Sequence, residues 1–288
     1  MKGVKELKRR LKGVKSIRKI TKAMEMVAAT KLRRLQERAL ATRPFARAIE
    51  GMVARVAAHA DITASPLLAQ PAKTLREAVV IVGADKGLCG SYNSNVHRTT
   101  VQHLRKLEAE GVQAEVWVFG KRAQGFFAKM RGLELRYAHP TAVEKVSYRE
   151  VAQLAKQIVA AFETGSVQRV SLVGTRMLTL ATYKPSVQAL LPVARPAGNA
   201  EGADYILEPD ANGILARLLP RNLEMQLYAA VLEALACEFA SRRLAMKSAS
   251  DNADEMSRFL SMEYNKARQS GITGELLEII GGAEALNG

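Results

Sequence analysis

Both ends of the chain carry apolar residues at helical spacing. Near the N-terminus the spacing is three and four residues, which is typical of a helix that packs along one narrow stripe. The apolar positions are Val4, Leu7, Leu11 and Val14, then Ile17, Ile20, Met24 and Val27, and then Ala28, Leu32, Leu35 and Ala39. Arg18 stands where the repeat would place the next apolar residue after Val14, so the pattern predicts a shift of phase there.

The C-terminal segment, from Asn212 to about Gly282, repeats the theme. Apolar residues recur every four positions at Leu215, Leu219, Leu223, Leu227, Val231, Leu235 and Phe239, and small residues follow at Ala240, Ala245, Ala249 and Ala253. Pro220 predicts a kink or a helix start, and Gly281-Gly282 predicts the helix end. An N-terminal helix over residues 2–58 would be on the order of 80 Å long. Two such helices cover each other's stripes most simply by pairing antiparallel.

Between these segments the apolar period changes to that of short strands alternating with helices. The predicted strands are Val79–Val82, Glu115–Phe119, Leu133–Tyr137 and Arg169–Val173, with further strands at Arg176–Tyr183 and Val187–Leu191. The predicted helices are Asn95–Glu110, Arg122–Lys129 and Tyr148–Glu163. This alternation indicates a doubly wound, Rossmann-like α/β domain. The chain therefore divides into a helix over residues 1–58, an α/β domain over 75–195 and a helix over 212–288, with residues 195–210 as a loop.

The stretch GADKGLCGSYNSN (83–95) follows the first predicted strand and raises the possibility of a phosphate site. A P-loop needs its lysine directly after the last glycine, but Lys86 precedes Gly87 here. The dinucleotide pattern also fails, because Gly83, Gly87 and Gly90 are spaced four and three apart. We interpret the stretch as a tight turn between a strand and a helix.

Charge narrows the choice of partner. The chain has a formal net charge of +15, and residues 1–50 hold 16 lysines and arginines against four acidic residues. This asymmetry predicts an acidic partner surface, which nucleic acid, an anionic membrane face or an acidic protein cavity would provide. Cys89 and Cys237 stand in no metal or redox spacing, and the sequence predicts no metal site.

Three stretches together resemble the gamma subunit of F-type ATP synthases. They are ITKAMEMVAATKLRR (20–34), ADKGLCGSYNSN (84–95), and AMKSASDNADEM with YNKARQSGITGELLEIIGGAEAL (within 245–286). The resemblance covers both ends and the middle of the chain in the same order. It implies a rotor whose terminal helices form an antiparallel coiled coil inside a ring of three alpha and three beta subunits.

The resemblance also implies what the chain does and where. The rotor transmits rotation between a proton-driven c ring and the catalytic beta subunits, with the epsilon subunit beside it, and so couples ion transport to ATP synthesis. The chain itself would have no catalytic residue, no cofactor and no metal. It would be a peripheral protein on the cytoplasmic side of a bacterial inner membrane.

Individual roles follow from the family's motifs. Contact with the beta subunit is implied for Met24, Cys89, Arg242, Arg268, Gln269, Thr273 and Glu275. Met24 and Arg242 would lie at the bearing, and Arg268 and Gln269 would bind a catch loop. The segment DYILEPD (204–210) resembles the family's foot on the c ring, which makes Tyr205, Leu207 and Glu208 candidates there.

Two other classes of function stay open at this stage. A basic coiled coil that binds nucleic acid would account for the charge of residues 1–50, although only 5% of the chain is aromatic and no stacking platform is visible. An enzyme that binds a nucleotide at residues 83–91 is the third possibility. Co-purification would separate the three, because each predicts a different bound molecule.

Overall fold

The structure, a computed structural model, describes residues 2–57, 59, 65–179, 182–193, 208 and 210–287. The chain forms two compact units. The helix-pair unit comprises residues 1–29 and 242–288, and the α/β unit comprises residues 30–241. Two long helices, α1 (Lys2–Ala57) and α5 (Ala211–Asn287), contribute to both units. No helix within the described ranges is long and apolar enough to cross a membrane.

Both long helices were predicted, and α5 begins within one residue of the predicted Asn212, but its predicted end is wrong. Pro220 lies inside α5 and does not begin it, so a kink at Pro220 stays a prediction. The helix also continues through Gly281 and Gly282 to Asn287. A glycine ends a helix by adopting a positive φ, and neither of these glycines does so.

The α/β unit contains a five-stranded sheet in the order β3-β2-β1-β4-β5. Its strands are β1 (Arg76–Val82), β2 (Gln113–Phe119), β3 (Glu134–Ala138), β4 (Arg169–Met177) and β5 (Tyr183–Leu191). The first four strands are parallel, and β5 pairs antiparallel with β4. This is the predicted doubly wound α/β class, with one antiparallel edge strand. The separate strand predicted at Arg176–Tyr183 is wrong, because Arg176 and Met177 end β4 and Tyr183 begins β5.

The helices of the unit connect these parallel strands. They are α2 (Tyr92–Ala109), α3 (Lys121–Phe127) and α4 (Tyr148–Glu163), with a short 3-10 helix, η2 (Val143–Lys145), before α4. A capping box begins α4: the Ser147 hydroxyl accepts from the Glu150 amide, and the Glu150 carboxylate accepts from the Ser147 amide. The sheet order reverses at β1, since β2 lies on one side of it and β4 on the other.

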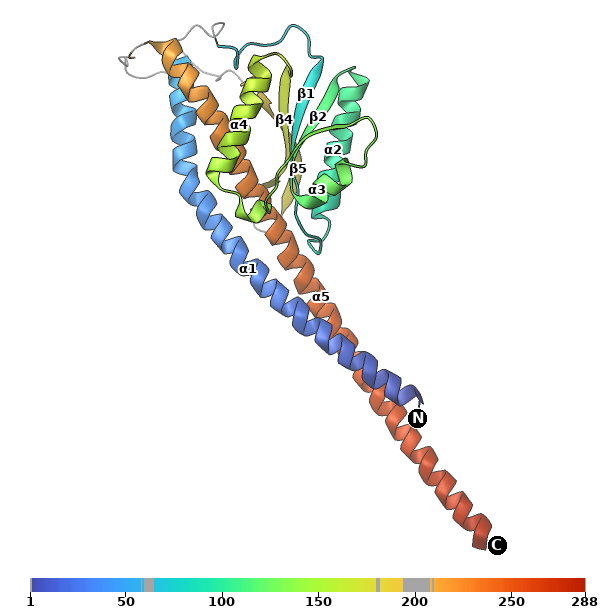
Figure 1. The fold of residues 1–288 in the computed structure, drawn as a ribbon. Coiled ribbons are helices and arrows are strands. Elements are labelled where there is room, and N and C mark those ends of the chain that lie inside the picture. Colours follow the sequence, from blue (N-terminus) through green and yellow to red (C-terminus); the bar gives the residue numbers. More distant parts are fainter. Residues whose placement is uncertain are drawn as a thin grey trace. The chain divides into compact units, whose positions relative to one another are not determined.

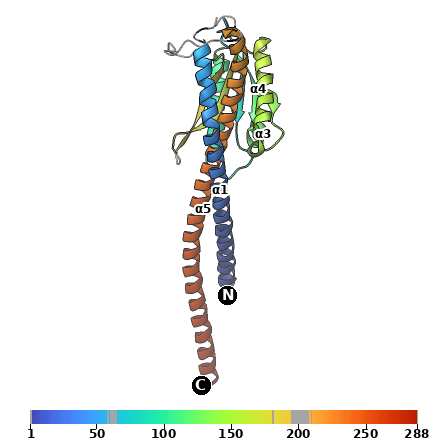
Figure 2. The same ribbon diagram turned by 90° about the vertical axis from the view of Figure 1, so that its left-hand side faces the viewer.

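The core of this unit lies around the sheet and includes Cys237 of α5. β1 is buried along nearly its whole length, as expected for a central parallel strand covered on both faces. Figures 1 and 2 show α1 and α5 side by side and antiparallel in this unit, next to the sheet. The predicted leucine stripe of α5 is confirmed as buried: Leu215, Leu219, Leu223, Leu227, Val231, Leu235 and Phe239.

Candidate functional site

The turn after β1 is built by close approach of two loops. The Gly83 amide donates to the Phe119 carbonyl at 2.9 Å, and Gly120 adopts a φ of +100°. A Cβ atom on Gly120 would lie 2.4 Å from the Gly83 oxygen, so only glycine fits there. The loops that end β1 and β2 therefore fill the space between them with backbone.

Asp85 fastens this turn to the rest of the sheet edge. Its Oδ1 accepts from the Lys121 amide at 3.1 Å and its Oδ2 from the Val143 amide at 2.8 Å. The Lys121 amide belongs to the first residue of α3, where a phosphate-binding loop would present free N–H groups. In this chain the Asp85 carboxylate accepts the hydrogen bond from the Lys121 amide, where a phosphate would accept it in such a loop.

α5 covers the same edge of the sheet at the point where the strand order reverses. In doubly wound folds, ligands bind in the crevice at the carboxyl ends of the strands at this reversal. The Ser241 hydroxyl donates to the Cys89 carbonyl at 2.5 Å, the Tyr92 hydroxyl to the Ala234 carbonyl at 3.1 Å, and the Cys237 thiol to the Thr175 carbonyl at 3.5 Å. The interpretation of GADKGLCGSYNSN as a structural turn agrees with these contacts.

Within the turn, Leu88 and not Cys89 is presented to the surface. Cys89 is 1% exposed, and its sulfur lies 3.3 Å from the Asn93 amide nitrogen, which donates to it. The prediction that Cys89 faces a partner is therefore corrected for this structure, because the thiol packs into the core. Leu88 is 65% exposed and has a φ of +60°, which is unusual for a branched residue. The other cysteine, Cys237, is also buried, and burial raises the pKa of its thiol to about 12.

In the helix-pair unit, the covered positions of α1 keep one spacing: Leu7, Leu11 and Val14 are half-buried, and Thr21 and Ala28 are buried. Arg18 Nε lies 3.1 Å from Asp254 Oδ1, and Thr21 is buried, with its hydroxyl donating to carbonyls of its own helix. The predicted shift of phase is wrong, since the buried residues Thr21 and Ala28 continue the seven-residue repeat of Val14. The Arg18 side chain itself is 53% exposed and reaches Asp254. A polar residue such as Thr21 can be buried when its polar atoms find partners. The apolar residues of the shifted stripe, Ile17, Ile20 and Val27, are instead exposed.

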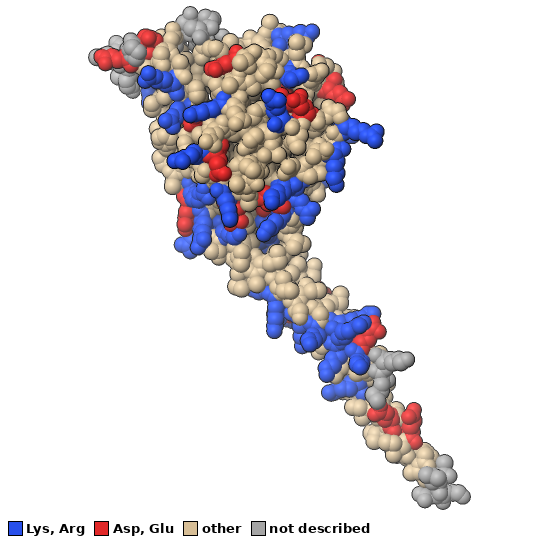
Figure 3. Space-filling view, in the orientation of Figure 1, with Lys and Arg blue, Asp and Glu red and all other residues tan. Residues whose placement is uncertain are grey.

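The N-terminal part of α1 carries a strong positive charge. Lys5, Lys8, Arg9, Lys12, Lys15 and Lys19 are all exposed, and among the described residues none of these six has an ion pair. Figure 3 shows basic side chains gathered along this part of the helix. The surface fits an acidic partner, which stays a prediction.

Near its C-terminus α5 has no helix opposite it in the described chain. The pairing of Arg18 with Asp254 places the start of α1 opposite residue 270 if the register continues. Beyond that point α5 exposes five large apolar side chains: Ile272, Leu276, Leu277, Ile279 and Ile280. Arg268, Gln269, Thr273 and Glu275 are also exposed there, so the structure brings these four predicted contact residues onto one helical segment.

The other predicted contact residues lie in different settings. Met24 is half-buried on α1, and Arg242 is buried on α5 with only 8% exposure. Arg242 therefore offers little surface to a partner. Of the predicted foot residues, Glu208 is exposed, while Tyr205 and Leu207 lie outside the described residues.

A buried polar cluster beneath α2 was not predicted from the sequence. Glu77 Oε1 lies 2.7 Å from His103 Nε2 and accepts from the Ser171 hydroxyl at 2.6 Å, while Oε2 accepts from Arg169 Nε at 2.8 Å. Burial alone would raise the pKa of Glu77, but the hydrogen bonds with His103 and Ser171 outweigh it and lower the pKa. The only sign of this cluster in the sequence is a charged residue, Glu77, next to the apolar run of β1. The partners of Glu77 are distant in sequence, so the sequence does not identify them.

Among the described residues, no group of three or more His, Cys, Asp or Glu side chains could hold a metal ion. The fold and these surfaces define a class of protein: an α/β domain built around a pair of long helices whose exposed faces are suited to binding other proteins.

Comparison with known proteins narrows this class. A family model described as ATP synthase matches residues 3–286. The ATP synthase gamma chain of Chelativorans sp. (strain BNC1) is 40% identical over 295 residues, covering 99% of this chain and 100% of the relative. That of Chlorobium luteolum is 38% identical over 287 residues, covering 98% of each. The chain belongs to the family of ATP synthase gamma chains.

Solved structures support the fold. The chain resembles one from the OSCP/F1/c-ring part of the Euglena gracilis mitochondrial ATP synthase, with a TM-score of 0.67, 21% identity, and coverage of 99% of this chain and 94% of that one. It also resembles one from the central stalk/c-ring structure of the Tetrahymena thermophila mitochondrial enzyme, with a TM-score of 0.58, 22% identity, and coverage of 80% and 99%. The family resemblance found in the sequence is confirmed, and nothing supports the nucleic-acid-binding alternative.

Proposed function

We propose that this chain is the central rotor subunit of an ATP synthase and transmits rotation between a c ring and catalytic beta subunits. The observation that carries the proposal is the C-terminal end of α5. This segment exposes Ile272, Leu276, Leu277, Ile279 and Ile280, with no α1 residue opposite in the described chain. A short helical segment that packs against nothing is marginally stable in water. The exposed apolar side chains at this end of α5 therefore indicate that a partner packs against them.

The ring of three alpha and three beta subunits is the partner that we propose for the helix-pair unit. Six exposed cations on α1, without ion pairs among the described residues, favour an acidic lining in that ring. Exposed charge pairs are worth only ~0–1 kcal/mol each, so such attraction would guide a turning shaft without holding it at one angle. The epsilon subunit and the c ring are the partners that we propose for the α/β unit.

The exposure of individual side chains supports specific contacts with the beta subunit. Arg268 and Gln269, with Thr273 and Glu275 one turn further, are proposed to bind the beta subunit through the polar groups that they expose. Met24 is proposed for the bearing. Arg242 would act there by positioning its helix, because it is buried. Leu88 takes the role that the family motif implied for Cys89.

The foot on the c ring is proposed at Tyr205, Leu207 and Glu208, on the strength of the family motif alone. We retain the division into segments 1–58, 75–195 and 212–288 as a proposal about function. The outer segments would serve as the shaft. The middle one, together with the loop 195–210 that follows it, would carry the contacts with epsilon and the c ring.

We propose further that the chain has no catalytic activity of its own and lies peripherally on the cytoplasmic side of a bacterial inner membrane. Support for the first point comes from the edge of the sheet, where Asp85 takes the first amide of α3 and α5 covers the strand ends. Isothermal titration of the purified chain with MgATP should give no binding heat. Micromolar affinity would contradict this point.

A disulfide between rotor and ring tests the rotor itself. Leu276 is exposed on α5, so Leu276→Cys should form a disulfide with a cysteine placed on the facing beta surface when their Cα atoms come within ~7 Å. Oxidation should stop ATP hydrolysis by the assembled complex, and reduction should restore it, because the bond ties the rotor to the ring.

The matched control links the rotor to itself. Lys22 and Asp251 line the same groove between α1 and α5, so Lys22→Cys and Asp251→Cys joined by a short bismaleimide should leave hydrolysis nearly unchanged. Rapid hydrolysis with the Leu276 disulfide essentially complete would overturn the rotor proposal. Equal loss from both crosslinks would show that general damage, and not tethering, stops the enzyme.

A further inference from the structure

The α/β unit contains a cavity that none of the contacts above uses. It lies between α1, α5 and the end of β4, and its volume is about 570 Å³. Small-molecule sites commonly measure ~300–1,000 Å³ and have mostly apolar walls. The apolar lining comes from all three elements: Ala39, Leu40 and Ala46 of α1, Ala229, Leu232 and Ala236 of α5, and Met177 of β4.

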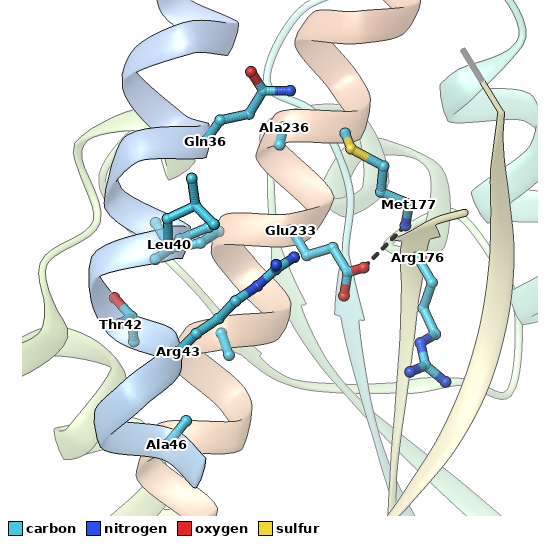
Figure 4. Close-up of a pocket in the computed structure, with 12 residues that line it drawn as sticks. Gln36, Leu40, Thr42, Arg43, Ala46, Arg176, Met177, Glu233 and Ala236 are labelled. Carbon is cyan, nitrogen blue, oxygen red and sulfur yellow. Dashed lines mark hydrogen bonds between the residues drawn. The ribbon is translucent and has the colours of Figure 1, made fainter. Parts of the chain in front are cut away.

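Two arginines stand on different walls of this cavity. Figure 4 shows Arg43 extending from α1 toward α5, while Arg176 extends from β4. Both are exposed, and within the described residues neither side chain has a hydrogen bond or an ion pair. Guanidinium groups bind carboxylates through two parallel hydrogen bonds, which makes unpaired arginines beside an apolar wall good anchors for such a group.

Glu233 is the one acidic residue in the lining, and its position is fixed. Its Oε1 accepts from the Met177 amide at 2.9 Å, so the side chain is held against β4 (Figure 4). Two arginines and one glutamate leave the lining with one net positive charge. This balance favours a ligand with a single negative charge, because a second would face Glu233 without a cation of its own.

We propose that this cavity binds a monoanionic amphiphile, a single alkyl chain ending in a carboxylate. The alkyl chain would lie on Leu40, Leu232 and Met177, and the carboxylate would sit between Arg43 and Arg176. Such a ligand would bridge α1, α5 and β4. The proposal does not depend on the rotor function, since it uses none of the residues assigned to the ring or to the c ring.

Dodecanoate is the probe, added to the purified full chain below its micelle concentration. Titration calorimetry should show saturable binding, and the ¹³C-methyl NMR signal of Met177, assigned by its loss in Met177→Leu, should move along the same titration curve. Dodecyl maltoside and dodecyltrimethylammonium have the same chain without the negative charge. They should bind at least about tenfold more weakly, because hydrogen bonds to charged groups are the stronger class.

Variants separate this site from general binding to apolar surface. Arg43→Gln and Arg176→Gln should each weaken dodecanoate binding about fivefold or more, whereas Arg47→Gln, an exposed arginine one turn along α1, should change nothing. Ala229→Phe should fill the cavity and abolish binding. If that variant loses its helical circular dichroism, Ala46→Leu fills the cavity from α1.

Three results would overturn the proposal. They are an unmoved Met177 signal at saturation, equal affinity for the uncharged and the anionic amphiphile, and unchanged affinity in both arginine variants.

Discussion

α5 passes through two settings that differ in how much of its surface the chain itself covers. In the α/β unit it buries leucines every fourth residue and polar side chains between them, including Asn222, Glu224 and Glu238. In the helix-pair unit it buries one narrow stripe made mostly of small or polar residues: Met246, Ser250, Ala253, Ser257 and Leu260. After Leu260 its large apolar side chains are exposed.

This difference shows how one helix can be held in its own domain at one end and expose a surface for a partner at the other. Burial contributes about 25 cal/mol per Å² of apolar surface, so the leucine stripe holds α5 firmly in the α/β unit. Serines and alanines bury little apolar surface, and the helix-pair unit gains correspondingly little from its own core. Its exposed apolar and basic side chains are the ones left for a partner.

The largest expected loss of stability comes from a substitution in the part of α5 that is buried in the α/β unit. Leu227 is 0% exposed in the α/β unit. Leu227→Ala should lower the free energy of unfolding by about 2–5 kcal/mol, through lost burial and the cavity left behind. Leu277→Ala, at a position 65% exposed on the same helix, should change it by less than about 0.5 kcal/mol. Urea titrations followed by circular dichroism compare the two, and equal losses would refute the comparison.

The buried cluster around Glu77 is the next most sensitive point of the α/β unit. Glu77→Gln should cost about 1–3 kcal/mol at pH 7, because Arg169 and Ser171 lose a charged acceptor. The pKa of Glu77 is lowered below 4.5 in the folded chain, so its contribution is fully present above pH 4.5 and is lost as the pH falls through the folded pKa. The difference between the variant and the wild type should therefore shrink in acid.

Glu134→Gln is the control for this prediction, because Glu134 is exposed and lies 3.9 Å from Arg76 in a surface ion pair. Its effect should be within about 0.5 kcal/mol, as for most surface ion pairs. A Glu77→Gln effect that does not change between pH 7 and acid would contradict the assigned cause.

The same contrast explains what the sequence could predict. Strands such as β1 and helices such as α4 were found because their apolar spacing is local, and α4 begins at the predicted Tyr148. The shift of phase predicted at Arg18 was wrong because an arginine and a threonine at heptad positions look like the end of an apolar stripe. The structure buries Thr21 there and pairs the exposed Arg18 with Asp254.

Features that depend on contacts between residues distant in sequence could not be predicted. The Glu77 cluster joins residues up to 94 positions apart, and nothing local marks Ser171 as its partner. The exposure of Leu88 in place of Cys89 depends on the turn conformation, and the antiparallel direction of β5 depends on its pairing with β4. The exposed residues from Arg268 to Glu275 were found through family motifs, since an exposed polar helix face carries no periodic signal of its own.

A smaller effect is expected at the available half of α5. Replacing Arg268 and Gln269 together with Ala should leave the free energy of unfolding within about 0.5 kcal/mol of wild type, because both are exposed. Binding to the alpha and beta subunits should weaken about tenfold, as hydrogen bonds to charged groups are lost. Lys156→Ala with Gln157→Ala on α4 is the matched exposed pair and should assemble normally. Wild-type assembly and proton pumping in the first double variant would show these roles to be misassigned.

The smallest expected effect of a substitution is at the turn after β1. There the exposed Leu88 directly precedes the buried Cys89. Leu88 holds a φ of +60° next to the buried Cys89, and a left-handed conformation costs a branched residue about 1–2 kcal/mol. Leu88→Gly should remove that strain. Since glycine also makes the unfolded chain more flexible, the net gain in the free energy of unfolding should be at most about 1 kcal/mol.

Leu88→Ala is the matched variant, because alanine keeps the strain but removes the exposed apolar group. If Leu88 is retained for a partner, both variants should weaken assembly with the beta subunit by a few fold, while only the glycine variant becomes more stable. Chemical denaturation measures the stability and co-purification measures the assembly. If both variants assemble as wild type, the exposed leucine has no partner, and binding to the beta subunit does not account for the strain at this turn. If the alanine variant also becomes more stable, the strain lies elsewhere in the turn.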